Sequence, residues 1–238
     1  MSRLSWGSPG ARVYYAGVDR GVLFTGGVGV PWIGLTAVRE APAFGVPTPY
    51  YVDGRKYLNE AVPEEYAANL EAFTYPDEFE LCDGTASNGE GLYIDEQQRY
   101  PFDLTYRTRV GNDLEGVDFG YRLHLIYNAM ASPTTKDHVT LGSETDPMGL
   151  NWALTTLPED MAGYEPVSHL MLDSRRTDPQ LLVQIENLLY GTAATEPTMP
   201  RPNDLLKLFK DRGDIDVEPT GYGQGLYGRG YYGGRPTN

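Results

Sequence analysis

Alternation of apolar and polar residues in two central segments constrains this chain more than any other feature. Residues 104–110 and residues 121–127 both follow a period of two, which is typical of strands because successive side chains point to opposite faces. The acidic, glycine-rich residues 111–120 lie between them. The pattern predicts a long antiparallel hairpin in a mainly β protein, with one face of each strand buried. The inward set is predicted to be Leu104, Tyr106, Thr108, Val110, Tyr121, Leu123, Leu125 and Tyr127.

Other extended segments lie on both sides of this hairpin. Residues 50–57 (YYVDGRKY) place Asp-Gly between β-forming flanks, a strong hairpin signal because both turn residues tolerate positive φ. Residues 13–24 predict either a hairpin or two short extended segments. Residues 26–34, with four glycines and a proline, predict an irregular arm or loop. Strands are also predicted over residues 65–75, 150–157 and 168–173, and a loop over residues 83–91.

One amphipathic helix is predicted over residues 178–190. Asp178 is a good N-cap, Pro179 suits the first helical position, and Gly191 suits the position after the end. An apolar stripe at helical spacing runs between them. A shorter helix is predicted over residues 203–210, after a proline-rich linker. The stripe consists of Leu181, Leu182, Ile185, Leu188 and Leu189.

These elements predict a β-sandwich or partial barrel with one flanking α-helix, an extended N-terminal arm and long hairpin loops. We divide the chain into an N-terminal arm with extended segments (1–48), a β domain containing the helix (49–202), and a C-terminal part (203–238). The last part holds the short helix and a Gly/Tyr-rich tail, GYGQGLYGRGYYGG. That tail is too rich in glycine to fold alone. It is equally compatible with a partner contact and with a disordered terminus.

Charge and cysteine content narrow the classes of partner. The chain has 33 acidic and 19 basic residues in 238, a net charge of −14, which disfavours tight binding to DNA because affinity comes from cations that neutralise phosphates. A surface along which DNA slides remains compatible. The single cysteine excludes an intrachain disulfide and fits synthesis in a reducing cytoplasm. The sequence lacks a run of about 18 apolar residues, so no membrane span is predicted.

Motifs for catalysis and cofactor binding are not found. The sequence has no phosphate-binding P-loop, no His-Glu-x-x-His and no Gly-x-Ser-x-Gly. His124 and His169 lie on predicted strands and could converge, with Asp173 as a possible partner; we favour histidines that are only hydrogen-bonded. Cys82 lies beside Asp83, which argues against a reactive thiolate.

The acidic residues of the central hairpin loop could bind calcium or could simply be hydrated by solvent. The loop offers several oxygen ligands, but their spacing matches no calcium-binding loop. We therefore expect no metal, no cofactor and no catalytic residue. The loop residues concerned are Asn112, Asp113, Glu115 and Asp118.

Arg107, Arg109 and Arg122 form a basic group in an acidic chain. Arg107 and Arg109 share a strand face, and Arg122 can join them from the partner strand. Two interpretations remain open. The arginines bind carboxylates of a neighbouring subunit, where opposite charges fix the register between subunits, or each arginine pairs with an acid of its own chain.

Several segments, in this order, resemble the major tail tube proteins of siphophages, especially those that infect actinobacteria. The resemblance covers roughly residues 6 to 210, and its motifs are structural, so it carries over no catalytic residue. The segments are Gly17–Leu23, Val30–Leu35, Tyr50–Tyr57, Phe73–Pro76, Leu104–Gly111, Gly120–Asn128, Ser168–Ser174 and Leu189–Thr192.

The resemblance implies a structural role in a virion. Six subunits would form a ring, part of each sheet would contribute to a barrel around a channel, and the rings would stack around a tape-measure protein. Tail terminator and tail-tip proteins are the other implied partners, with assembly in the host cytoplasm and DNA passing through without specific binding. The residues we expect at inter-subunit interfaces are Tyr50, Tyr51, Asp53, Arg55, Tyr57, Arg107, Arg109 and Arg122.

Parts of the sequence are compatible with two other classes of function. A carbohydrate-binding β-sandwich would use exposed aromatic rings as stacking platforms, and the sequence offers Trp6, Trp32 and Trp152 besides its tyrosines. The alternating pattern around Trp152 instead predicts burial. An acid/base hydrolase requires a pair of carboxylates, and composition alone selects none.

Overall fold

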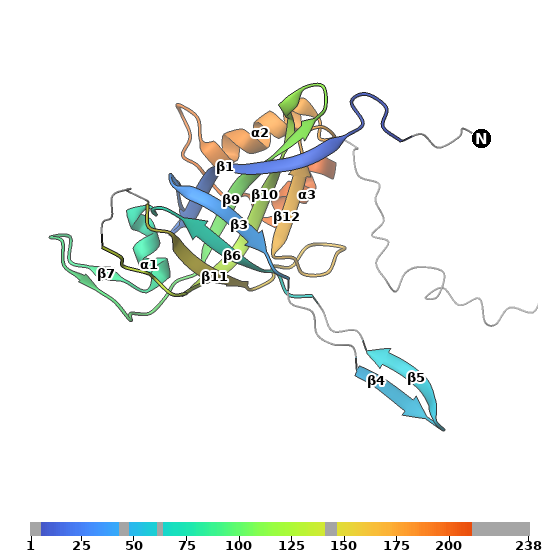
Figure 1. Ribbon diagram of the computed structural model, residues 1–238, viewed down its shortest axis with the longest axis horizontal. Helices are drawn as coiled ribbons and strands as arrows, with labels where there is room; N and C mark the ends of the chain where they lie inside the picture. The colour runs from blue at the N-terminus through green and yellow to red at the C-terminus, as the bar shows by residue number, and fades with distance from the viewer. Residues whose placement is uncertain (1–5, 43–47, 61–63, 141–146, 211–238) are drawn as a thin grey trace, which may run out of the picture.

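The computed structural model describes residues 6–42, 48–60, 64–140 and 147–210. The protein is mainly β, as predicted: an antiparallel sheet in the order β2-β1-β9-β10-β11-β6-β3, with β12 also paired to β10 (Figure 1). Its strands are β1 (Val13–Thr25), β2 (Val28–Pro31), β3 (Leu35–Glu40), β6 (Ala67–Ala72), β9 (Phe102–Asn112), β10 (Gly116–Pro133), β11 (Leu150–Thr156) and β12 (His169–Asp173).

The longest strand, β10, changes partner along one of its edges. Residues 122–126 pair with β12, and residues 129–133 pair with β11. Asn128 lies between the two regions with a φ of 47°, and its backbone N–H donates to Asp103 rather than to the neighbouring strand. The sheet curls, so that β3 approaches β1: the side chain of Leu35, at the start of β3, lies directly over Gly21 of β1. This gives a partial barrel.

Both faces of the central strands are buried, which corrects the prediction of one buried face. His124 lies opposite Tyr106, and Leu125 lies opposite Thr105, so the two predicted inward sets lie on opposite faces of the sheet. Leu104 and Tyr106 pack inside the curl with Trp32, Trp152 and Phe79. Leu123, Leu125 and Tyr127 pack on the outer face against the helices.

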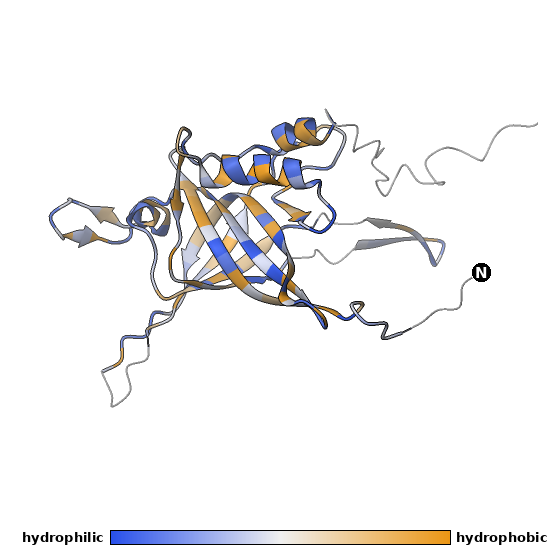
Figure 2. Ribbon diagram, turned by 90° about the horizontal axis from the view of Figure 1, so that it is seen from above, coloured by the Kyte–Doolittle hydropathy of each residue, from blue (hydrophilic) through white to orange (hydrophobic). Residues whose placement is uncertain are grey.

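The outer face is covered by α2 (Pro179–Tyr190) and α3 (Pro202–Lys210) (Figure 2). The predicted caps of α2 are confirmed. The Asp178 carboxylate accepts from the backbone N–H groups of Gln180 and Leu181 at 3.0 Å, and Gly191 follows the helix with a φ of 73°. The apolar stripe is largely buried, including Leu181 and Leu189.

The N-terminal segment differs from its prediction. Residues 13–25 form one strand, because bulges between Ala16 and Val18 and between Asp19 and Val22 absorb the glycine-rich stretch. The predicted arm over residues 26–34 contains β2. The turn Gly26-Gly27, with φ of 58° and 83°, is the tight turn that only glycine adopts readily. Residues 1–48 thus supply three strands of the main sheet, while the division into domains stays a prediction.

Smaller elements complete the fold. The strands β4 (Thr48–Val52) and β5 (Arg55–Glu60) form the predicted Asp-Gly hairpin. The β9–β10 turn is shorter than predicted, since the strands extend to residues 112 and 116. The one-turn helix α1 (Glu80–Asp83), preceded by the 3-10 turn η1 (Asp77–Phe79), and the two-residue strands β7 (Ala86–Ser87) and β8 (Tyr93–Ile94) were not predicted. The Gly/Tyr-rich tail lies outside the described residues. Within those residues, no helix has the length and apolar character needed to cross a membrane.

Candidate functional site

The β4–β5 hairpin carries five of the residues predicted at an interface. It forms a two-stranded sheet of its own and stands clear of the main sheet in Figure 1. Its turn is set locally, because Asp53 and Gly54 both adopt positive φ (52° and 72°). Tyr57 is an extra residue of β5 between the Tyr50–Leu58 and Tyr51–Lys56 pairs. The sequence therefore determined the hairpin and its turn.

The hairpin is unusually apolar for an exposed element. Tyr51 is 64% exposed and Tyr57 is 78% exposed, and Tyr50, Val52 and Leu58 are about half exposed. An isolated two-stranded hairpin is at best marginally stable in water. Clustered apolar side chains on a surface mark contacts with other macromolecules. This arrangement suits packing against a second protein surface.

The three arginines each have an acid of their own chain. Arg107 is only 9% exposed and binds both carboxylate oxygens of Asp19, at 2.9 and 3.1 Å. Its guanidinium also lies 3.7 Å from Glu186 and over the Tyr121 ring. Two arginines hold the Asp19 carboxylate: although burial acts to raise the pKa of Asp19, hydrogen bonds from Arg107 and Arg109 hold it below its ordinary value.

Arg109 and Arg122 are less buried. Arg109 bridges Asp19 and Asp118, at 2.9 and 3.0 Å. Arg122 lies 3.7 Å from Asp173 and stacks over the Tyr15 ring. The own-chain pairing that the sequence left open therefore exists for all three arginines. A role between subunits stays a prediction.

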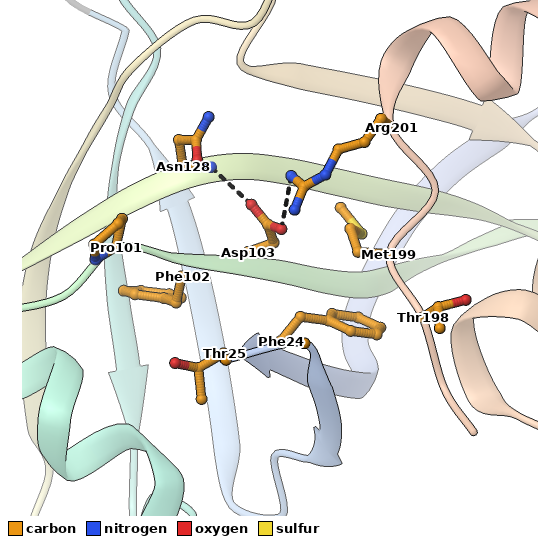
Figure 3. Close-up of a pocket in the computed structure, with 11 residues that line it drawn as sticks. Phe24, Thr25, Pro101, Phe102, Asp103, Asn128, Thr198, Met199 and Arg201 are labelled. Atoms are coloured by element: carbon orange, nitrogen blue, oxygen red, sulfur yellow. Dashed lines mark hydrogen bonds and ion pairs between the residues drawn. The ribbon is translucent and has the colours of Figure 1, made fainter.

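A polar cluster lies where β10 changes partner, beside a cavity of about 260 Å³ (Figure 3). Asp103 accepts from the Asn128 N–H at 2.8 Å and pairs with Arg201 at 2.9 Å, and Arg201 also binds Glu159 at 2.9 Å. Burial raises the pKa of Asp103, while Asn128 and Arg201 act to lower it. The ion pairs of Arg201 with Asp103 and Glu159 anchor the segment before α3 to the sheet.

The two strand histidines converge, but not with the acid considered. His124 Nδ1 lies 3.0 Å from His169 Nε2, and the nearby carboxylate belongs to Glu40. Asp173 pairs with Arg175 and Arg122 instead. Burial lowers the pKa of both imidazoles, that of His124 to about 3. Glu40 escaped the sequence analysis because β3 reaches this place only through the curl of the sheet.

Other predicted groups are engaged inside the protein. Trp32 and Trp152 are buried, so two of the three tryptophans considered as stacking platforms are not on the surface. For Trp152 the alternating pattern predicted this burial. Cys82 is buried, and burial is the main cause that raises the pKa of its thiol.

Three of the four polar residues considered in the central hairpin loop are also engaged within the protein. Asn112 accepts from the backbone N–H groups of Leu114 and Glu115, and Asp113 accepts from Gly10 N–H at 3.0 Å. Asp118 binds Arg109. These contacts stabilise the turn and hold it against the segment before β1.

No family model and no curated protein matches the sequence. Among solved structures, the chain is similar to the sheath-tube complex of an extracellular contractile injection system (PVC) in the extended state, with 14% identity, a TM-score of 0.37, and coverage of 65% of this chain and 88% of that one. It is also similar to the tube-terminating cap of the anti-feeding prophage, with 11% identity, a TM-score of 0.37, and coverage of 73% and 95%. It is similar as well to a sheath/tube terminator of the PVC system, with 14% identity, a TM-score of 0.33, and coverage of 71% of this chain and 99% of that one. Similarities at this level establish no shared fold, and no functional conclusion follows from them.

Proposed function

We propose that this protein is a structural subunit of a bacteriophage tail tube. The proposal is supported by the resemblance of its ordered segments to siphophage tail tube proteins and by a curled antiparallel sheet covered on one face by helices. The observation that carries it is the β4–β5 hairpin, whose tyrosines are exposed on an element too small to be stable alone.

In this proposal the hairpin packs on a neighbouring copy of the chain. Six copies form a ring, rings stack into a tube around a tape-measure protein, and terminator and tip proteins close the ends. The net charge of −14 lets DNA pass without sticking, because like charges repel phosphates. Arg109, which is 40% exposed, is the basic side chain of the central group best placed to reach a second subunit.

The test is assembly, followed by negative-stain electron microscopy and light scattering over a concentration series. Wild-type protein is expected to form rings or hollow tubes of uniform width. Deletion of residues 51–57, and the milder double variant Tyr51→Ser/Tyr57→Ser, should leave a folded monomer that does not polymerise. The matched control is Tyr164→Ser, which removes a partly exposed tyrosine from a different loop.

The outcomes separate the proposal from its alternative. Normal tubes from the double variant would show that the hairpin is not the interface. Wild-type protein that remains monomeric at every concentration, and that binds soluble glycans, would replace the tail tube with a carbohydrate-binding module.

A further inference from the structure

We propose that Glu40, His124 and His169 form a binding site for a divalent transition metal ion of the zinc type. The three residues come from β3, β10 and β12, so they are far apart in the sequence. The assignment does not depend on the tail tube proposal, because it concerns the interior of one subunit. Two imidazole nitrogens and one carboxylate oxygen are the ligand types that zinc takes in proteins, whereas calcium and magnesium prefer oxygen alone.

The spacing of the three donor atoms fits one ion. His124 Nδ1 and His169 Nε2 are 3.0 Å apart, and the Glu40 carboxylate oxygen lies 3.5 Å from the first and 4.0 Å from the second. Ligands at about 2.0–2.1 Å from a tetrahedral ion are separated by roughly 3.3 Å. Changes of up to about 0.7 Å in these separations, the largest between Glu40 and His169, would therefore bring all three donors to bonding distance.

The surroundings orient the ligands. His124 Nε2 lies 2.9 Å from the Thr108 hydroxyl. When Nε2–H donates to Thr108, the Nδ1 lone pair is free for an ion, which is the outer-shell arrangement common for metal-binding histidines. The Tyr106 hydroxyl donates to the Glu40 carboxylate at 3.0 Å, and the Tyr106 ring stacks on the His124 imidazole with centroids 4.6 Å apart.

In this proposal water completes the coordination, and the site has a route of entry. The ring of Tyr66 packs on His169 at 4.7 Å. Its hydroxyl is buried, and the hydroxyl group beside it belongs to Tyr106, the residue that donates to Glu40. Tyr66 and Tyr106 therefore enclose the site from the side of the two imidazoles. The Glu40 side chain is 41% exposed, so an ion can reach the site from solvent.

The ion would act as a clip within the sheet. Glu40 is the last residue of β3, the strand at one end of the sheet order, while His124 and His169 lie on the paired strands β10 and β12. Binding would link β3 to β10 and β12 and would replace the hydrogen bond between the two imidazoles. Because ligands that bind only the folded state stabilise it by mass action, zinc should raise the stability of the subunit.

The experiment uses the full-length protein without a histidine tag, after treatment with a chelator. Zinc binding is measured by isothermal titration calorimetry, and Co²⁺ is used as a second probe because tetrahedral cobalt absorbs visible light. We expect one ion per chain, an absorption band with Co²⁺, and a Tm raised by roughly 5–10 °C at free zinc of about 100 times Kd. The variants Glu40→Gln and His169→Gln should each weaken zinc binding by at least about tenfold.

The control variant is His138→Gln, which removes the third histidine from an exposed segment and should bind zinc as wild type does. Folding is checked by the Tm of each variant without metal; Glu40→Gln alters a partly exposed side chain and keeps its shape. Equal zinc affinity in all three variants, or the absence of stoichiometric binding in wild-type protein, would overturn the proposal. Either result concerns the monomer and leaves tube formation to its own test.

Discussion

Replacing Asp19 by asparagine removes the one carboxylate that Arg107 and Arg109 share. Asp19 on β1 lies directly opposite Arg107 on β9, and its two oxygens accept from both guanidinium groups at 2.9 to 3.1 Å. Asparagine keeps the shape of the side chain but has a single acceptor oxygen. Its amide group would face a guanidinium donor, so at least one of the present hydrogen bonds is lost together with the charge.

The magnitude follows from burial. Arg107 is 9% exposed and Asp19 is 27% exposed, and removal of one partner of a buried ion pair costs about 3–5 kcal/mol because the other charge is left unpaired. Here Glu186, at 3.7 Å, and the Tyr121 ring, at 4.3 Å, still stabilise the charge of Arg107 after Asp19 is replaced. We therefore expect the free energy of unfolding to fall by about 2–3 kcal/mol.

The assay is urea unfolding followed by the fluorescence of the buried tryptophans, with the m-value checked for constancy. The control is Asp118→Asn: Asp118 also binds Arg109 but is 81% exposed, so its loss should cost less than about 1 kcal/mol. Equal, small losses in both variants would refute the view that Asp19 neutralises a buried arginine. An unchanged monomer that no longer assembles would instead assign the arginines to the contact between subunits.

Three further predictions follow from burial and charge. Cys82 should react with a thiol reagent at pH 8 far more slowly in the native protein than in urea, because burial raises the pKa of its thiol; equal rates would contradict its burial. The pKa of Asp173 is lowered to about 2, mainly by the hydrogen bond from Arg175, and lies below the unfolded value of about 3.9. The ionised Asp173 carboxylate therefore stabilises the folded state above pH 4, and this stabilisation is lost as the pH falls toward 2. The difference in unfolding free energy between wild type and Asp173→Asn should narrow over that range. A difference that stays constant would contradict the lowered pKa of Asp173. Finally, a net charge of −14 predicts weak binding to duplex DNA, and retention on a DNA column at about 0.15 M salt would contradict this.

Elements whose signals are local were predictable. The Asp53-Gly54 turn needs two residues that tolerate positive φ, and both adopt it. The helix α2 begins after Asp178 and ends before Gly191, where the cap preferences placed its ends. The predicted strands over residues 65–75, 150–157 and 168–173 correspond to β6, β11 and β12.

Errors arose where a local signal had two meanings. Gly17 and Gly21 are compatible with a turn and equally with bulges in a single strand. Because β1 pairs with β9 along its length, the strand is continuous and contains two bulges. The glycines of residues 26–34 predict an irregular arm, but Gly26 and Gly27, both with positive φ, form a tight turn instead. The short elements α1, β7 and β8 carry too few residues for a periodic signal.

The sequence by itself determined the longer strands other than β1, the Asp53-Gly54 turn and the helices α2 and α3, because these depend on side-chain period and backbone preferences within a few residues. Only the tertiary structure decided which faces meet. The register of β9 and β10 puts His124 beside Tyr106, and the curl of the sheet carries Glu40 to the same place. Likewise, nothing in the sequence distinguishes Asp19 from the other acids among the 33, and only strand pairing places it opposite Arg107. Such contacts join residues tens of positions apart, and their geometry is fixed by the register and curvature of the whole sheet rather than by any short segment.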